Sequence, residues 1–422
     1  MENNYSSKVL RAIDLIWQHF DSASHREGFN LLVEAAREDD ADAFCFLGRC
    51  YLGPEYVRDT EVFESDDEKG LELIRESVRR GSATGVLVAL RCGALTPSLE
   101  EEMPFANLRE AFEKVMIYAQ SGSAFAMYVI GNAWYWGDLL LICPELQAKF
   151  TDVKIYNAVA WPSAVVFFEN TFERGLGLAF GNYQEIYDSG LARIPQTRFE
   201  YYFNILADAG DPDICNNYAC YCSKQDDNER ALRYYIKAAE GGNVNALYNL
   251  GSIYYNGEGV EEDSVKAFEY FSRAATQNYV NAFFMLGCFY FEGTEPVVQD
   301  YAEAVKWMRL AIENGFRSDW KAAGVLAVCL QNGLGTEQDD DEAFEFLEYI
   351  VESGNLDNFW SPLDGQLCAA LGAAYAFGRG VEKNLATGLE YLEKAIRLGC
   401  HEALSYKEEL IGTDKGSNEK LC

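Results

Sequence analysis

Three pairs of glycines form the pattern in this sequence that most resembles a ligand-binding motif. The pairs are Gly257 and Gly259, Gly333 and Gly335, and Gly378 and Gly380. A glycine loop binds phosphate when it leads from a strand into a helix N-terminus, because backbone N–H groups then point at the anion. Here each pair follows a helical stretch, and the acidic run 261–263 after the first pair would repel phosphate. The glycines are therefore predicted to form turns between helices.

Residues suited to catalysis or metal binding are few or scattered. The three histidines, His19, His25 and His401, lie near the two ends of the chain, so they cannot together form a metal site or a Ser-His-Asp arrangement. The twelve cysteines have no constant spacing and lie in apolar helical stretches, which predicts buried thiols. The 67 acidic residues make chance pairs of carboxylates inevitable. We expect no enzymatic activity, no cofactor and no metal.

The charge balance restricts the kind of partner. The formal net charge is −32 over 422 residues, which disfavours direct binding to nucleic acid or to an anionic membrane. A protein or peptide partner is expected, and a basic one would be attracted. Segment 1–20 lacks the apolar core of a signal peptide, and no run reaches the roughly 18 apolar residues of a membrane span. We expect a cytoplasmic protein.

The elements that carry these residues repeat along the chain. ALYNLGSIYYNG at 246–257 and AFFMLGCFYFEG at 282–293 share Ala, Leu, Gly, Tyr and Gly at the same offsets. Aligning the weaker copies on the central glycine, or its equivalent, gives anchors at positions 48, 90, 131, 184, 219, 251, 287, 327 and 372. A second stretch with apolar residues three and four apart follows each anchor. Each unit is therefore predicted to be a helix hairpin.

A single hairpin cannot bury both of its faces, so the hairpins must stack on one another. The sequence predicts an all-α fold, an α/α superhelical solenoid of about nine to ten hairpins. Segment 5–20 and segment 401–411 are expected to be capping helices, and 412–422 a flexible tail. The repeats are degenerate over 1–243 and regular over 244–400, within one continuous solenoid. An insertion at 138–162 lengthens one interval, and its apolar run LLLIC is expected to fold back on the solenoid.

The pattern from Ala246 to Ala275 closely resembles the Sel1-like repeat family, whose members are relatives of the tetratricopeptide repeat. The matching residues are Ala, Leu-Gly, Tyr, Gly-x-Gly-Val, Asp, Lys-Ala, Tyr and Ala-Ala, and GRGVEKNLATGLEYLEKAIRLG at 378–399 matches as well. The resemblance is strong over 244–400 and traceable over 25–243. It implies an all-α right-handed superhelix that holds protein partners and does not catalyse a reaction.

Acidic runs occur in the loops between the two helices of several hairpins. They are 64–68, 226–229, 261–263 and 337–342. Two interpretations stay open. Stacking could place the runs along one edge as a negative ridge, or the acids could cap the following helix by accepting hydrogen bonds from its first N–H groups. Capping explains one acid in each loop but not a whole run.

The first helix of each hairpin is predicted to turn one face towards a concave groove. The candidate partner-binding residues on these faces are Tyr128, Asn132, Tyr135, Trp136, Asn216, Asn245, Tyr248, Tyr255, Phe284, Phe291 and Lys321. A run of exposed aromatic side chains marks a partner site, and the polar residues could hydrogen-bond a peptide backbone. For each single aromatic residue the alternative is packing between repeats.

Two binding functions follow from these features. The first is a non-enzymatic scaffold that binds a peptide or protein in the concave groove. The second is an acidic inhibitor or immunity-type protein that neutralises a basic enzyme or mimics the charge of nucleic acid. Affinity that falls steeply with salt would favour the second function, whereas binding that depends on the aromatic residues would favour the first.

Overall fold

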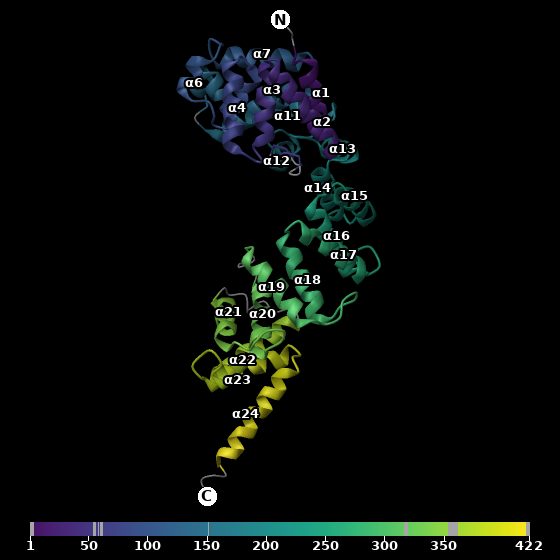
Figure 1. Ribbon diagram of the computed structural model, residues 1–422, viewed down its shortest axis with the longest axis vertical. Helices are drawn as coiled ribbons and strands as arrows, with labels where there is room; N and C mark the ends of the chain where they lie inside the picture. The colour runs from purple at the N-terminus through teal and green to yellow at the C-terminus, as the bar shows by residue number, and fades with distance from the viewer. Residues whose placement is uncertain are drawn as a thin grey trace. The chain divides into compact units, whose positions relative to one another are not determined.

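The computed structural model describes residues 4–53, 56, 57, 59, 62–150, 152–315, 320–352 and 362–418. Over these residues the chain forms 24 helices and no strand (Figure 1). The all-α prediction is confirmed. Contacts within the chain divide it into two compact units, unit 1 (Met1–Asn243) and unit 2 (Val244–Cys422).

Unit 1 contains the helices α1 to α15 and unit 2 the helices α16 to α24. In unit 1 their bounds are α1 Ser7–Trp17, α2 Ser22–Arg37, α3 Ala41–Tyr51, α4 Asp67–Arg79, α5 Ala83–Arg91, α6 Pro97–Glu102, α7 Leu108–Gln120, α8 Ala124–Trp136, α9 Leu139–Ile142, α10 Pro144–Gln147, α11 Val153–Phe172, α12 Phe180–Ser189, α13 Gln196–Ala209, α14 Pro212–Ser223 and α15 Asn228–Glu240. In unit 2 they are α16 Val244–Asn256, α17 Ser264–Thr276, α18 Val280–Glu292, α19 Tyr301–Glu313, α20 Trp320–Asn332, α21 Asp340–Glu352, α22 Pro362–Phe377, α23 Leu385–Arg397 and α24 Glu402–Asn418.

Every anchor found in the sequence lies in the first helix of a hairpin. The hairpins are α3/α4, α5/α7, α8/α11, α12/α13 and α14/α15 in unit 1, and α16/α17, α18/α19, α20/α21 and α22/α23 in unit 2. A further pair, α1/α2, precedes them. Successive hairpins pack on each other within each unit, so the predicted repeat architecture is confirmed there (Figure 1). That the two units continue as one solenoid stays a prediction.

The acidic loops cap the second helices. The Asp66 carboxylate accepts a hydrogen bond from the backbone N–H of Lys69 at 3.0 Å, and the Asp263 carboxylate accepts one from Lys266 at 2.9 Å. Asp227 caps α15 in the same way. Each cap satisfies an N–H group that the helix itself cannot pair. Capping therefore accounts for one acid in each of these loops, and a ridge built from the remaining acids stays a prediction.

The paired glycines form turns at which neighbouring repeats approach closely. Gly335 and Gly380 both have a backbone φ of 68°, a left-handed conformation that favours glycine. A Cβ atom added to Gly335 would lie 2.2 Å from the carbonyl carbon of Tyr301, and one added to Gly380 would lie 2.1 Å from the carbonyl oxygen of Asp340. Tyr301 and Asp340 each begin the second helix of the preceding hairpin. These glycines thus serve packing between repeats.

The core of unit 1 is rich in aromatic rings where α1, α3 and α8 meet. Phe46 and Phe125 are almost fully buried, with ring centres 4.7 Å apart. The ring of Trp17 lies 5.7 Å from Phe46 and 5.5 Å from Phe125. Such aromatic contacts stabilise a core beyond the area that they bury. Trp17 and Phe125 also lie beside Arg49, which lines the site described below.

The insertion at 138–162 is helical and packs on its own hairpin. It forms α9, α10 and the first half of α11, and Leu139 and Ile142 are buried as expected. The Trp161 indole N–H donates to the carbonyl oxygen of Tyr135 at 3.1 Å, which fixes α11 on α8. One side of this segment remains exposed and apolar, at Leu141, Val153, Ile155 and Val159.

The C-terminal helix is longer than predicted. α24 continues to Asn418, because no proline interrupts the segment EALSYKEELIGTDKGSN, and the predicted boundary at 411 is corrected. Residues 419–422 lie outside the described part of the chain. Among the helices that the structure describes, none is long and apolar enough to cross a membrane.

Candidate functional site

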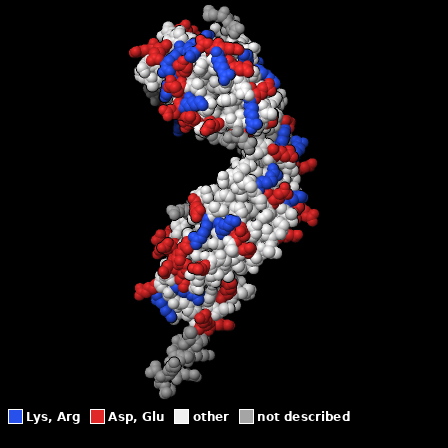
Figure 2. All heavy atoms as spheres, in the orientation of Figure 1, with Lys and Arg blue, Asp and Glu red and all other residues white. Residues whose placement is uncertain are grey.

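Unit 1 contains a cavity of about 490 Å³ between the first helices of four successive hairpins. Its wall includes Arg49 from α3, Leu87 and Arg91 from α5, Tyr128, Asn132 and Trp136 from α8, Ile142 from α9 and Asn182 from α12. Tyr56, in the loop after α3, completes the wall beside Arg49. Figure 2 shows acidic side chains spread over the visible face of both units with basic side chains among them.

Three of the predicted partner-binding residues lie together at this cavity. Tyr128, Asn132 and Trp136 are four residues apart along α8, so they share one helix face. The Ser123 hydroxyl accepts a hydrogen bond from the backbone N–H of Ala126 and begins α8, and Gly137 ends the helix with a φ of 84°. Trp136 is 51% exposed, which is unusual for a large aromatic residue.

The prediction that Tyr135 faces the same groove is corrected. Tyr135 is buried and its ring stacks on Trp161 at 5.4 Å. Its hydroxyl donates to a carboxylate oxygen of Glu185 at 2.5 Å. Burial, reinforced by that carboxylate, raises the pKa of the Tyr135 hydroxyl. The physical reason is helical geometry, because consecutive residues are rotated by about 100° and Tyr135 and Trp136 therefore point to different faces.

Arg49 is a buried arginine in the wall of the cavity. Only 5% of the residue is exposed. Its guanidinium carbon lies 5.0 Å from the ring centres of both Tyr56 and Phe125, 5.8 Å from that of Tyr128 and 5.9 Å from that of Trp17. Within the described residues no carboxylate pairs with Arg49, and its Nε is buried without a hydrogen-bond partner. Aromatic ring faces are thus the only groups seen to stabilise this charge in the part of the chain that is described.

Arg91, in contrast, has an internal counter-charge. Its guanidinium lies 4.3 Å from the ring centre of Trp136 and 3.1 Å from the carboxylate of Asp138. Burial raises the pKa of the Asp138 carboxyl, and the Arg91 charge opposes this shift. On the opposite side, Asn182 donates its side-chain amide to the Asn132 carbonyl oxygen at 3.0 Å. The cavity therefore has one paired and one unpaired arginine among its described residues.

Sequence analysis did not identify Arg49 and Arg91 as site residues. Each of them directly follows an anchor, at positions 48 and 90, as Asn132 follows the anchor at 131. The signal was present in the repeat register, because the residue after the anchor is polar or charged in three successive hairpins. A search for aromatic residues alone overlooked it.

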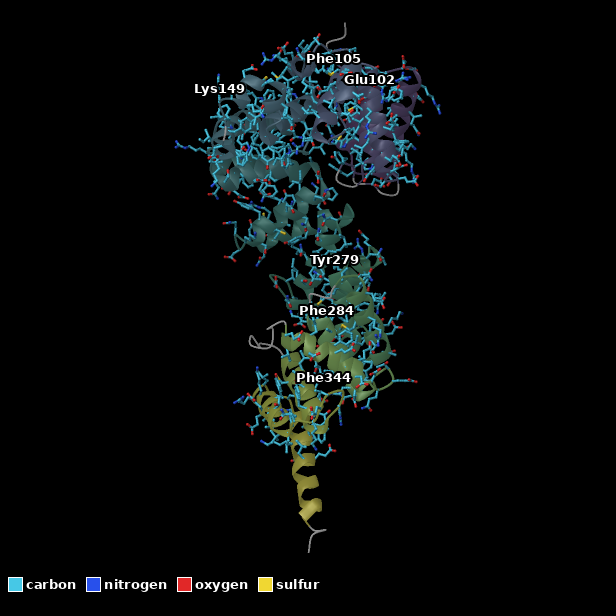
Figure 3. The ribbon with its side chains drawn as sticks, turned by 90° about the vertical axis from the view of Figure 1, so that its left-hand side faces the viewer. Glu102, Phe105, Lys149, Tyr279, Phe284 and Phe344 are labelled. Carbon is cyan, nitrogen blue, oxygen red and sulfur yellow. The ribbon has the colours of Figure 1, made fainter. Side chains whose placement is uncertain are left out.

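The other predicted partner-binding residues do not gather in one place. Asn216 is buried in α14, whereas Asn245 and Lys321 are exposed near the starts of α16 and α20. Tyr248 packs on Tyr279 with ring centres 5.2 Å apart, and Tyr255 packs on Phe289 at 5.6 Å. Phe284 and Tyr279 are labelled in Figure 3. Asn216 is 6% exposed and lines neither this cavity nor the groove of unit 2 described below, so its assignment to a binding groove is corrected.

Of the predicted residues in unit 2, Phe291 lines a groove. This groove, of about 600 Å³, lies between α18, α20, α22 and α24. Its polar wall includes Glu292, Asn332, Glu402 and Tyr406, and the Tyr406 hydroxyl donates to the Asn332 side chain at 3.1 Å. The charged side chains of this groove are both acidic.

The stacked hairpins define a helical repeat protein, and the hairpins from residue 215 onward match a known repeat family. Residues 215–243, 244–279, 281–316, 320–355 and 366–400 match the Sel1 repeat. The chain therefore contains five Sel1 repeats, a helical repeat related to the tetratricopeptide repeat. Sel1 repeats typically form non-enzymatic scaffolds for protein interaction.

Solved structures provide further similarities. A Sel1 repeat protein from Oxalobacter formigenes is 25% identical, covers 53% of this chain and 84% of its own length, and has a TM-score of 0.41. A protective antigen of uropathogenic Escherichia coli with an SLR fold is 18% identical, over 93% and 91%, with a TM-score of 0.40. An immunity protein from Pseudomonas aeruginosa is 19% identical, over 55% and 84%, with a TM-score of 0.31. Scores this low carry no argument about function. No curated protein matches the chain.

Proposed function

We propose that this protein is a non-enzymatic scaffold that binds a peptide or protein partner in the cavity of unit 1. The observation that carries the proposal is the shared position of Tyr128, Asn132 and Trp136 on the cavity wall. A volume of about 490 Å³ lies within the range of ligand pockets, which is roughly 300 to 1,000 Å³. It can admit one or a few side chains of a partner.

The residue types of the cavity favour recognition. Tryptophan, tyrosine and arginine dominate the energetic centres of protein interfaces, and all three occur here. The half-exposed indole of Trp136 offers apolar area that a partner could cover at little cost in conformational entropy. The polar groups are arginines, asparagines and a paired carboxylate, which suit hydrogen bonding to a partner and not the activation of a nucleophile.

The cysteines support action in a reducing compartment. The eleven cysteines within the described residues are free thiols, and six of them are buried. A chain of this kind is typical of the cytoplasm, where disulfides rarely persist. The cytoplasmic location is therefore retained as part of the proposal.

The test is selection from a phage-displayed random peptide library on the full chain. Trp136→Ala should abolish the enrichment of the selected peptides, because it removes the exposed ring that they would cover. Tyr201→Ala is the matched control, since Tyr201 is an aromatic residue in unit 1 that is 57% exposed and does not line the cavity. Both variants should keep the helical circular dichroism of the parent. Peptides that bind equally well to Trp136→Ala would refute the assignment of the site.

A further inference from the structure

The geometry points to a carboxylate of the partner as the group that the Arg49 guanidinium binds in this cavity. The inference rests on the proposed function, because it specifies the chemistry of the peptide that occupies the same site. Its occupant is an acidic peptide, with the carboxylate supplied by an Asp or Glu side chain or by a free C-terminus. A protein with a net charge of −32 would thus bind an acidic segment through one local positive site.

A buried cation without a counter-charge is an unusual feature of a folded protein. Transfer of a guanidinium from water into the protein is unfavourable unless its charge and its N–H donors are paired. Four aromatic ring faces around Arg49 supply attraction to the charge, but a ring face replaces the hydrogen bonds of water only weakly. The Nε atom shows this loss of hydrogen bonds directly, because it is buried and has no hydrogen-bond partner within the described residues.

The cavity places this charge where a ligand can approach it. Arg49, Tyr56 and Tyr128 all belong to the cavity wall, so the guanidinium and two of its rings border the open volume. A carboxylate accepts two parallel N–H bonds from a guanidinium, which adds geometric specificity as well as energy. Such a bond is also stronger in a site with little water than at an exposed surface.

The second arginine determines which anion fits. Arg91 is already paired with Asp138 at 3.1 Å, so the pair adds almost no net charge to the cavity. One unpaired guanidinium balances one negative charge, and the Asp138 carboxylate in the same wall would repel a dianion. A carboxylate therefore fits the site better than a phosphate group, which carries close to two charges at neutral pH.

The neighbouring side chains can hold the rest of the peptide. Asn132 and Trp136 follow Tyr128 along the same face of α8, away from Arg49. The side-chain carbonyl oxygen of Asn132 accepts a hydrogen bond from Asn182. The side-chain N–H groups of Asn132 can therefore donate to a peptide carbonyl. Trp136 would then cover an apolar residue next to the acidic one.

The experiment selects peptides on the full chain from two random libraries, one with a blocked and one with a free C-terminus. Selected peptides are expected to contain Asp or Glu, or to require the free C-terminus. Changing that residue to Asn or Gln, or amidating the C-terminus, should weaken binding about 10- to 100-fold in titration calorimetry, the value of a lost charge-assisted hydrogen bond. A peptide with phosphoserine in place of the acid should bind no better than the acidic one.

Variants of the protein test whether Arg49 is the residue that binds the carboxylate. Arg49→Met keeps an unbranched apolar stem without the charge and should weaken binding of the acidic peptide by the same factor, whereas Arg49→Lys keeps the charge and should weaken binding less. Arg26→Met is the matched control, because Arg26 is an exposed arginine of α2 outside the cavity. The peptide exchange on the parent protein remains decisive if an Arg49 variant fails to fold.

The outcomes separate the two proposals. Selected peptides that depend on Trp136 but bind equally well with Glu or Gln would overturn the carboxylate inference and leave the scaffold function in place. Peptides that prefer phosphoserine would replace the carboxylate by a dianion and also overturn it. If no peptide depends on Trp136, the proposed function itself fails.

Discussion

The cavity of unit 1 and the groove of unit 2 are built on the same repeat, yet their walls differ in chemistry at one register position. The residue after the anchor is Arg49, Arg91 or Asn132 in three of the four hairpins around the cavity; in the fourth it is Glu185, which does not line the cavity. In unit 2 the equivalent residues are Ser252, Cys288, Val328 and Ala373. Val328 lines the groove, where the charged wall residues are Glu292 and Glu402. One wall therefore suits an anion and the other suits a cation.

This difference shows that the positions of the repeat that stabilise the fold are not the positions that determine the chemistry of a cavity. The anchor glycine, the small residues and the apolar stripe recur because every hairpin must pack on its neighbours. Where the residue after the anchor lines a cavity, as Arg49, Arg91, Asn132 and Val328 do, it can be charged or polar in one unit and apolar in the other. A basic partner of the kind that the net charge alone favours would match the acidic groove of unit 2, and an acidic peptide would match the cavity of unit 1.

The largest effect is expected from transferring the arginine to unit 2. Val328→Arg should destabilise unit 2 by about 3 to 5 kcal/mol, because it forces a charge and a longer side chain into the apolar cluster around residue 328. Val328 is 4% exposed and belongs to the apolar cluster that contains Ala327, Leu347 and Leu371. Hydrogen exchange of the amides in α20 and α22 would measure the loss. Unchanged exchange would mean that the groove stabilises a cation as well as the cavity does.

The next effect concerns the glycine pairs, which unit 2 has and the hairpins around the cavity lack. Gly380→Ala should cost about 3 kcal/mol of unfolding free energy, since it adds a clash with Asp340 to an unfavourable left-handed backbone. Gly93→Ala in unit 1 is the matched control, because Gly93 has a similar φ of 70° and open space around it. It should cost only about 1 kcal/mol. Equal losses in urea unfolding would show that close approach between repeats adds nothing.

A smaller effect is expected from the pH dependence of the stability of unit 1. Burial raises the pKa of Asp42 on α3 from 3.8 to about 6, against a hydrogen bond that the Ser82 hydroxyl donates to it at 2.5 Å. The folded protein therefore keeps this proton to a higher pH than the unfolded chain does. Its contribution to stability is present at low pH and is lost as the pH rises from 3.8 to about 6.

The expected loss from Asp42 is about 1 to 2 kcal/mol, less than the full shift implies because the side chain is partly exposed. Hydrogen exchange in α3 and α5 at several pH values would measure it. Asp42→Asn should remove this part of the pH dependence. A variant that keeps the same pH profile as the parent would show that another group titrates.

Most of the fold could be predicted from the sequence, because repetition makes the same packing solution visible many times. The helix hairpins, the glycine turns and the capping acids each recur. Agreement among several repeats therefore distinguishes a structural pattern from a chance one. The groove residues were harder to assign. Tyr135 and Trp136 are adjacent in the sequence, and only the contact of α8 with α11 shows that Trp161 covers the first and leaves the second exposed.

Arg49 illustrates what the sequence could not show. An arginine after an anchor has the same sequence signal whether it is solvated, paired or buried. Its significance depends on Trp17, Tyr56, Phe125 and Tyr128, which come from separate parts of the chain and surround it only after folding. The unsatisfied Nε is likewise a property of the packed structure.

The most direct test of the central claim is a double-mutant cycle between Arg49 and the acidic residue of a selected peptide. Binding free energies are measured by calorimetry for the parent and Arg49→Met, each with the acidic peptide and its Gln counterpart. If the guanidinium binds the carboxylate, the coupling energy should reach at least about 1.5 kcal/mol, as for close charge pairs at interfaces. A coupling energy below about 0.5 kcal/mol, the range of independent sites, would contradict it.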